Sequence, residues 1–228
     1  MKRYRWLLGC CLFLSIGMLW AADEPDLRML QQKAAQSRDM EGYVGVCKYL
    51  YQTEENPELL LLYADSIHQL ATKSKKPEQL VEYYIWASEG NFIKGDFQQG
   101  YALKRKAIAL AEKAGLKFAI SQSCCDMGYY CNVDARYDSA RYYFRKGLEA
   151  GEDLSEAGEA CRTMLTNYAS SFLFEGKTDS ALVYTIRASE RSAADKDTAM
   201  LIENLNQLGT IYRRKKDLEN CIANFEQA

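Results

Sequence analysis

The chain has 228 residues, of which 48% are hydrophobic and 26% are charged, and its formal net charge is −2. This balance is typical of a globular protein, and it argues against intrinsic disorder, a polytopic membrane protein and nucleic-acid binding through this region. The chain contains only 3 prolines and no Asn-Gly turn pair, so long uninterrupted helices are possible and an all-α fold is predicted.

The N-terminus has the pattern of an export signal. Lys2, Arg3 and Arg5 precede an apolar run from Trp6 to about Ala22, after which the chain becomes polar. This order of basic, apolar and polar segments predicts a signal peptide over residues 1–22. Because bulky residues precede the expected cleavage site, an uncleaved signal anchor is the alternative. Either reading predicts an exported protein that is periplasmic or membrane-associated.

Residues 23–80 predict helices that fit the repeat pattern described below only poorly. The expected helices cover residues 26–37, 40–53 and 57–73, and the last begins at Asn56-Pro57, a sequence typical of a helix start. We expect this segment to form divergent repeats that cap the N-terminal end of a larger repeat array.

The remaining chain repeats with a period of about forty residues. Asp138-Ser139-Ala140 recurs 41 residues later as Asp179-Ser180-Ala181, and extending this match predicts repeats over 81–120, 121–161, 162–201 and an incomplete 202–228. Small residues recur at the eighth, twentieth and twenty-seventh positions of each repeat. They are Ser88, Gly128, Ala169 and Gly209; Gly100, Ala140, Ala181 and Cys221; and Ala107, Gly147, Ala188 and Ala228.

Small residues on two antiparallel helices permit close approach, so each repeat is predicted to be a helix hairpin. We expect Gly128 to lie against Ala140 with no large side chain between them. A single hairpin cannot bury its apolar face, and the repeats must therefore stack.

These positions resemble the tetratricopeptide repeat (TPR) family, most closely in Gly209, Tyr212, Cys221, Phe225 and Ala228. The resemblance implies a right-handed α-solenoid of antiparallel helix hairpins. The repeats of this chain are longer than those usual in the family, and in this they are similar to the repeats in exported sensor regions of bacterial envelope regulators. The chain departs from the family pattern at the twenty-fourth position, where Lys104 and Thr185 replace the aromatic residue.

In this family the first helix of each repeat lines a concave groove. The resemblance therefore implies groove residues at the second, fifth, ninth, twelfth and thirteenth positions, where the alternative is an ordinary solvated surface. The candidate binding residues are Tyr129, Asn132, Phe174, Asn206 and Arg213. None of these groove positions carries a lysine, which disfavours a clamp for a peptide carboxylate.

No catalytic or cofactor motif is present, so we expect neither enzymatic activity nor a cofactor. A zinc site is not expected either, because His68 is the only histidine and no CxxC pair occurs. The six cysteines after the N-terminal segment are read as buried thiols rather than as a disulfide framework. Asp134 and Asp138 flank a predicted turn, where helix capping is the expected role.

The predicted function is that of a non-enzymatic, exported TPR scaffold that mediates protein–protein interaction through a protein or peptide partner. We expect it to be the sensory region of a larger regulatory protein, and a structural assembly factor of the cell envelope is the alternative. Membrane anchoring is expected through the N-terminal apolar segment or through a segment after Ala228, where the repeat pattern stops in mid-helix.

Overall fold

The computed structural model describes residues 26–54 and 56–228. The predicted signal segment, residues 1–22, lies outside the described residues. None of the described helices combines the length and the apolar composition needed to cross a membrane. Within these residues the protein consists of helices and the segments that join them, without strands, so the all-α helical-repeat fold predicted from the sequence is confirmed.

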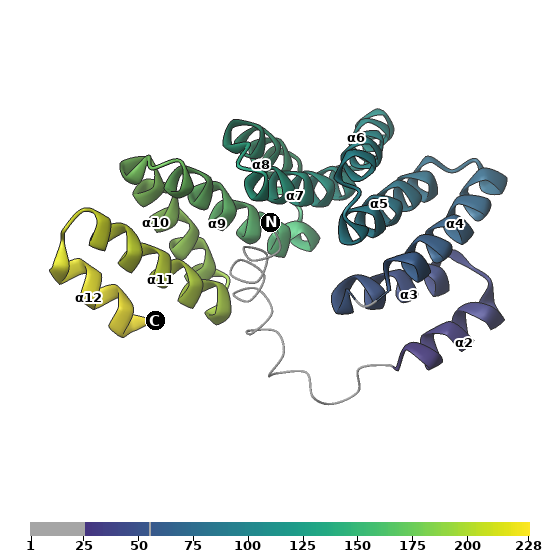
Figure 1. Ribbon diagram of the computed structural model, residues 1–228, viewed down its shortest axis with the longest axis horizontal. Helices are drawn as coiled ribbons and strands as arrows, with labels where there is room; N and C mark the ends of the chain where they lie inside the picture. The colour runs from purple at the N-terminus through teal and green to yellow at the C-terminus, as the bar shows by residue number, and fades with distance from the viewer. Residues whose placement is uncertain (1–25, 55) are drawn as a thin grey trace. The chain divides into compact units, whose positions relative to one another are not determined.

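The chain divides into two compact units, which are described separately (Figure 1). The first unit is Pro25–Cys161, and the second unit comprises Arg162–Ala228. The first unit contains α2 (Leu27–Ser37), α3 (Met40–Thr53), α4 (Pro57–Ser74), α5 (Pro77–Lys94), α6 (Phe97–Ala114), α7 (Lys117–Val133), α8 (Tyr137–Gly151) and the 3-10 turn η1 (Ser155–Ala157). Helix α9 (Gly158–Phe174) spans the boundary, and α10 (Thr178–Ala194), α11 (Thr198–Arg214) and α12 (Leu218–Gln227) follow.

The turn inside each hairpin recurs at the same repeat position. The fifteenth residue of every predicted repeat has a positive φ; these residues are Gly95 (93°), Ala135 (56°), Gly176 (83°) and Lys216 (62°). This left-handed conformation ends the first helix and redirects the chain into the second. Glycine adopts it without steric cost, whereas alanine and lysine adopt it at a cost in free energy.

The small eighth position lies against the aromatic ring at the twenty-fourth position. A Cβ atom added to Gly128 would lie 2.8 Å from Cζ of Phe144, and closer still to two other atoms of that ring. The pairing of Gly128 with Ala140 predicted from the sequence did not include this contact with Phe144. In the fourth repeat, a Cβ at Gly209 would lie 2.8 Å from the Phe225 ring. The absent side chain at the eighth position makes room for the aromatic ring at the twenty-fourth.

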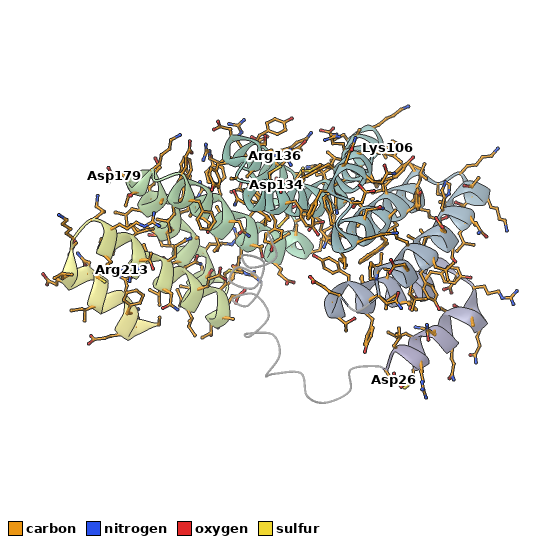
Figure 2. The ribbon with its side chains drawn as sticks, viewed as in Figure 1. Asp26, Lys106, Asp134, Arg136, Asp179 and Arg213 are labelled. Atoms are coloured by element: carbon orange, nitrogen blue, oxygen red, sulfur yellow. The ribbon has the colours of Figure 1, made fainter. Side chains whose placement is uncertain are left out.

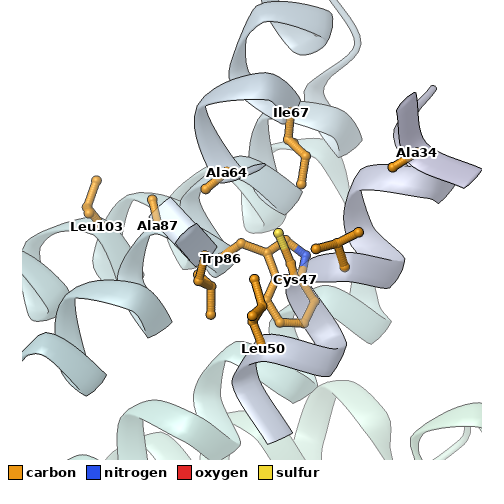
Figure 3. Packing of buried hydrophobic residues seen from close by; sticks show 10 residues of the cluster. Ala34, Cys47, Leu50, Ala64, Ile67, Trp86, Ala87 and Leu103 are labelled. Atoms are coloured by element: carbon orange, nitrogen blue, oxygen red, sulfur yellow. The ribbon is translucent and has the colours of Figure 1, made fainter. Parts of the chain in front are cut away.

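The N-terminal helices share one apolar core with the first predicted repeat (Figure 3). Trp86 of α5 lies among Cys47 and Leu50 of α3, and the same cluster extends to Ala34 of α2 and Leu103 of α6. The three helices predicted over residues 26–73 are found within one residue of the expected bounds. The helices outside the repeat pattern are thus packed continuously onto the repeats of the first unit.

The cysteines are buried, as predicted. Every one of the six in the described residues is buried and none forms a disulfide; they are Cys47, Cys124, Cys125, Cys131, Cys161 and Cys221. Burial raises the pKa of the Cys47 thiol from 9.0 to about 12, and the charge of Glu82 adds to this effect. These side chains therefore contribute apolar packing volume to the fold.

Candidate binding face of the first unit

A buried lysine connects three helices of the first unit. Lys104 of α6 is fully buried, and its ammonium group donates hydrogen bonds to Glu89 of α5 and, at 2.9 Å, to Asp126 of α7. Glu89 also accepts a hydrogen bond of 2.8 Å from the hydroxyl of Tyr130. We call these four residues the Lys104 cluster. Lys104 stands at the twenty-fourth repeat position, where the second and fourth repeats carry phenylalanine.

The Lys104 cluster holds two carboxyl groups for one ammonium group. Burial by itself would lower the pKa of Lys104, but the charges of Asp126 and Glu89 outweigh it, and the pKa of Lys104 is raised. The pKa of Glu89 is raised, chiefly by burial and further by the charge of Asp126, although Lys104 opposes the shift. With both carboxyl groups ionised, the cluster carries one surplus negative charge, which its buried surroundings screen weakly.

Aromatic side chains surround the Lys104 cluster. Tyr51 at the end of α3 is 37% exposed, and its ring meets Trp86 edge-on at 6.3 Å between centroids. The pKa of the Tyr51 hydroxyl is raised by burial and by the nearby charges of Glu89 and Asp126. Tyr51 therefore lies against Trp86 and within electrostatic range of both carboxylates, while part of its surface stays accessible.

The aromatic side chains around the Lys104 cluster continue along α5 and α7. Tyr130 stacks on Phe92 with ring centroids 3.6 Å apart, and Tyr129 meets Tyr130 edge-on at 5.5 Å. Trp86 donates a hydrogen bond of 2.9 Å from its indole nitrogen to Glu82. Aromatic and acidic side chains from the successive first helices α3, α5 and α7 therefore meet around one cluster. We call this group of residues the acidic-aromatic face. Its partly exposed members are Tyr51, Asp126, Tyr129 and Tyr130, and its buried members are Trp86 and Glu89.

Two of the predicted binding residues belong to the first unit. Tyr129 is half-buried within the acidic-aromatic face, where it adds to the rise in the pKa of Tyr51. Asn132, one turn further along α7, is only 8% exposed and presents little surface. The sequence placed Glu89 at a groove position but gave Asp126 no role. It also missed Tyr51, which lies outside the repeat pattern.

The other three predicted residues belong to the second unit. Phe174, the last residue of α9, is 43% exposed. Asn206 and Arg213 are exposed on α11, and their spacing of seven residues places them on the same side of that helix. Arg213 is labelled in Figure 2. The structure thus places exposed side chains at all three positions.

The second unit has an uncharged counterpart of the Lys104 cluster. Thr185 of α10 donates a hydrogen bond of 2.9 Å to Gln207 of α11, and Gln207 donates one of 2.6 Å to Ser170 of α9. These residues hold the same three repeat positions as Lys104, Asp126 and Glu89, namely the twenty-fourth, the sixth of the following repeat and the ninth. Lys104 to Asp126 and Thr185 to Gln207 are both steps of 22 residues. We call this group the Thr185 triad.

A separate polar cluster fixes the turn between α7 and α8. Tyr101 donates a hydrogen bond of 2.7 Å to Asp134, and the guanidinium of Arg136 lies 4.2 Å from the centre of the Tyr101 ring (Figure 2). No side chain caps the start of α8. Asp134 is the C-cap residue of α7 through its backbone, but its carboxylate does not cap α8 and binds Tyr101 of the preceding hairpin and Arg136 instead. Asp138, expected to cap as well, pairs with Arg141.

Within residues 26–54 and 56–228, histidine, cysteine and carboxylate side chains form no group that could hold a metal ion. No family model matches the sequence, and no curated protein matches it. Among solved structures, the chain is similar to the crystal structure of BtubC (BKLC) from P. vanneervenii, with a TM-score of 0.69 and 14% sequence identity. The similarity covers 88% of this chain and 84% of that chain. At this level of identity it establishes the helical-repeat fold alone.

Proposed function

We propose that the chain is a non-enzymatic TPR scaffold that binds a partner protein or peptide along the first helices of its repeats. The acidic-aromatic face supports this proposal, because its partly exposed side chains come from α3 and α7 and contact buried side chains of the intervening helix α5. Such surfaces formed across stacked repeats are suited to extended ligands. Aromatic residues are also enriched among those that contribute most to binding energy.

The proposal is tested by selecting peptides from a display library on the purified full chain. Replacing Tyr51 with alanine should lower the affinity for the selected peptides about tenfold, which corresponds to a loss of about 1.4 kcal/mol of binding free energy. Tyr142→Ala is the matched control, because Tyr142 is 49% exposed on α8, a second helix. Recovery of no binding peptide, or equal binding to both variants, would refute the proposal.

We further propose that the protein is exported and serves as the sensory region of a larger regulatory protein. The support is the basic and apolar order of residues 1–22 together with a binding face that contains no catalytic arrangement we recognise. A reporter enzyme active only outside the cytoplasm, fused after Ala228, should be active in cells. A fusion active only in the cytoplasm would refute export. A regulatory domain encoded after Ala228 would favour sensing, whereas further repeats would favour the alternative of an envelope assembly factor.

A further inference from the structure

The first and second units use the same three repeat positions for a buried polar contact, but the set in the first unit is charged and the set in the second unit is neutral. Ser170, Thr185 and Gln207 join their helices through neutral hydrogen bonds. Glu89, Lys104 and Asp126 join theirs through charged ones. The Thr185 triad shows that the fold can satisfy these positions without any charge. Since burying charge costs free energy, packing alone gives no reason for the charged set.

Among the three charged side chains of the cluster, only that of Asp126 is substantially exposed. Lys104 is completely buried and Glu89 nearly so, whereas the side chain of Asp126 is 31% exposed. Tyr51, whose ring packs edge-on against Trp86, is also partly exposed. A ligand that approaches Asp126 therefore meets a carboxylate before it meets the buried ammonium group.

This arrangement selects the charge of the ligand. A cation gains attraction from the surplus carboxylate charge and from the faces of nearby aromatic rings. An anion would meet Asp126 first, with Lys104 inaccessible behind it. The sign of the exposed charge therefore disfavours recognition of a peptide carboxylate and favours a cationic side chain.

We infer that the Lys104 cluster and Tyr51 bind the cationic end of a lysine or arginine side chain from an extended segment of a partner protein. This inference rests on the proposed function and specifies the partner of the same face. The ammonium or guanidinium group lies against Asp126 with Tyr51 beside it. The remaining peptide follows the first helices α5 and α7.

The test measures binding of a fluorescent peptide of alternating serine and lysine to the full chain by anisotropy. The arginine version should bind comparably, while versions with norleucine or glutamate in place of lysine should bind at least tenfold more weakly. Free N-acetyl-lysine amide, at the same concentration as the peptide, should not displace it, because the amide lacks the extended backbone. Equal binding of the norleucine or glutamate peptide, or displacement by the free amide, would overturn the inference.

The second unit supplies the decisive variant. The triple change Glu89→Ser, Lys104→Thr and Asp126→Gln installs the residues of the Thr185 triad at the matching positions. The triple variant should keep the helical content of the wild type, but its affinity for the lysine peptide should fall about tenfold. Glu112→Gln is the control, because it changes the net charge of the chain by the same amount at an exposed site of α6 and should leave binding unchanged.

Asp126→Asn alone provides a second measurement should the triple variant fail to fold, and it should weaken the lysine peptide while the chain stays folded. Unchanged binding in a folded triple or single variant would overturn the inference. So would a loss of the same size in the Glu112→Gln control. The proposed function has a separate test, and it fails if Tyr51→Ala weakens the binding of none of the selected peptides. If selected peptides depend on Tyr51 but contain no lysine or arginine, only the present inference fails.

Discussion

The contact between Gly128 and Phe144 predicts that a single methyl group will destabilise the first unit. In Gly128→Ala, the new Cβ would lie 2.8 Å or less from three atoms of the Phe144 ring, a separation that real Cβ atoms essentially never show. Phe144 is fully buried, so its ring cannot move into solvent. Overpacking of this kind costs about 1–3 kcal/mol, and the better helix propensity of alanine returns about 0.5–1 kcal/mol. The expected net loss is about 1–2 kcal/mol.

Two other glycines calibrate this prediction. Gly209 holds the same repeat position, but its neighbour Phe225 is 42% exposed and can rotate away, so Gly209→Ala should change stability by less than about 0.5 kcal/mol. Gly45 lies within α3 with its nearest neighbouring atom, in Leu30, at 3.9 Å. Gly45→Ala should therefore stabilise the protein by about 0.5–1 kcal/mol.

The assay is urea unfolding followed by far-ultraviolet circular dichroism, with the free energy of unfolding compared across the three variants. The double variant Gly128→Ala with Phe144→Leu separates two effects of the ring. If the packing of the ring outweighs the clash, the free energy of unfolding of the double variant should be closer to that of Gly128→Ala. If relief of the clash dominates, it should be closer to that of the wild type. The decisive comparison is between the single variants. If Gly128→Ala is as stable as Gly45→Ala, the contact between the eighth and twenty-fourth positions is refuted.

Three further predictions concern buried charge, backbone strain and pH. Lys104→Met leaves two carboxylates without their cation and should cost about 3–5 kcal/mol in urea unfolding, whereas a loss under about 1 kcal/mol would contradict the buried ion pair. Ala135→Gly removes a Cβ from an exposed residue with a φ of 56° and should raise the free energy of unfolding by about 1 kcal/mol; a lower value would refute strain there. Burial raises the pKa of Cys131 from 9.0 to about 11, so its contribution, at most about 2–3 kcal/mol, is present below pH 9 and lost as pH rises toward 11. Urea midpoints that stay constant from pH 8 to pH 11 would contradict it.

The helices and their repeat spacing could be predicted because they depend on local residue patterns. The start at Asn56-Pro57 illustrates this, since the Asn56 side chain accepts a hydrogen bond of 2.9 Å from the backbone of Leu59. Which recurring positions contact one another is a different question. The sequence shows that small and aromatic residues recur, but it does not show that Phe144 lies across Gly128.

The acidic-aromatic face was only partly predictable for the same reason. Glu89 was placed in the groove from its repeat position, but its partners, Lys104 and Asp126, lie 15 and 37 residues away in the chain. Nothing in local periodicity pairs such residues. Tyr51 belongs to a helix without the repeat pattern, so only the folded arrangement shows that it packs against Trp86 and lies within electrostatic range of the same carboxylates.

The twenty-fourth position nevertheless carries a signal that can be read once the packing is known. Where the eighth residue is glycine, as in the second and fourth repeats, the twenty-fourth is phenylalanine. Where the eighth residue has a Cβ, as with Ser88 and Ala169, the twenty-fourth is Lys104 or Thr185.

The Cβ of the eighth residue occupies the place that an aromatic ring at the twenty-fourth position would need. In these two repeats the twenty-fourth residue is therefore not an aromatic residue that packs on its own hairpin. In both such repeats it forms a hydrogen bond with the sixth residue of the next repeat. The alternation therefore changes what each repeat presents to its neighbour. After a glycine at the eighth position the twenty-fourth residue closes its own hairpin, and after a larger residue it contributes a polar group to the junction between repeats. Only one of the two junctions described carries charge, which is why the acidic-aromatic face forms around Lys104 and has no charged equivalent around Thr185.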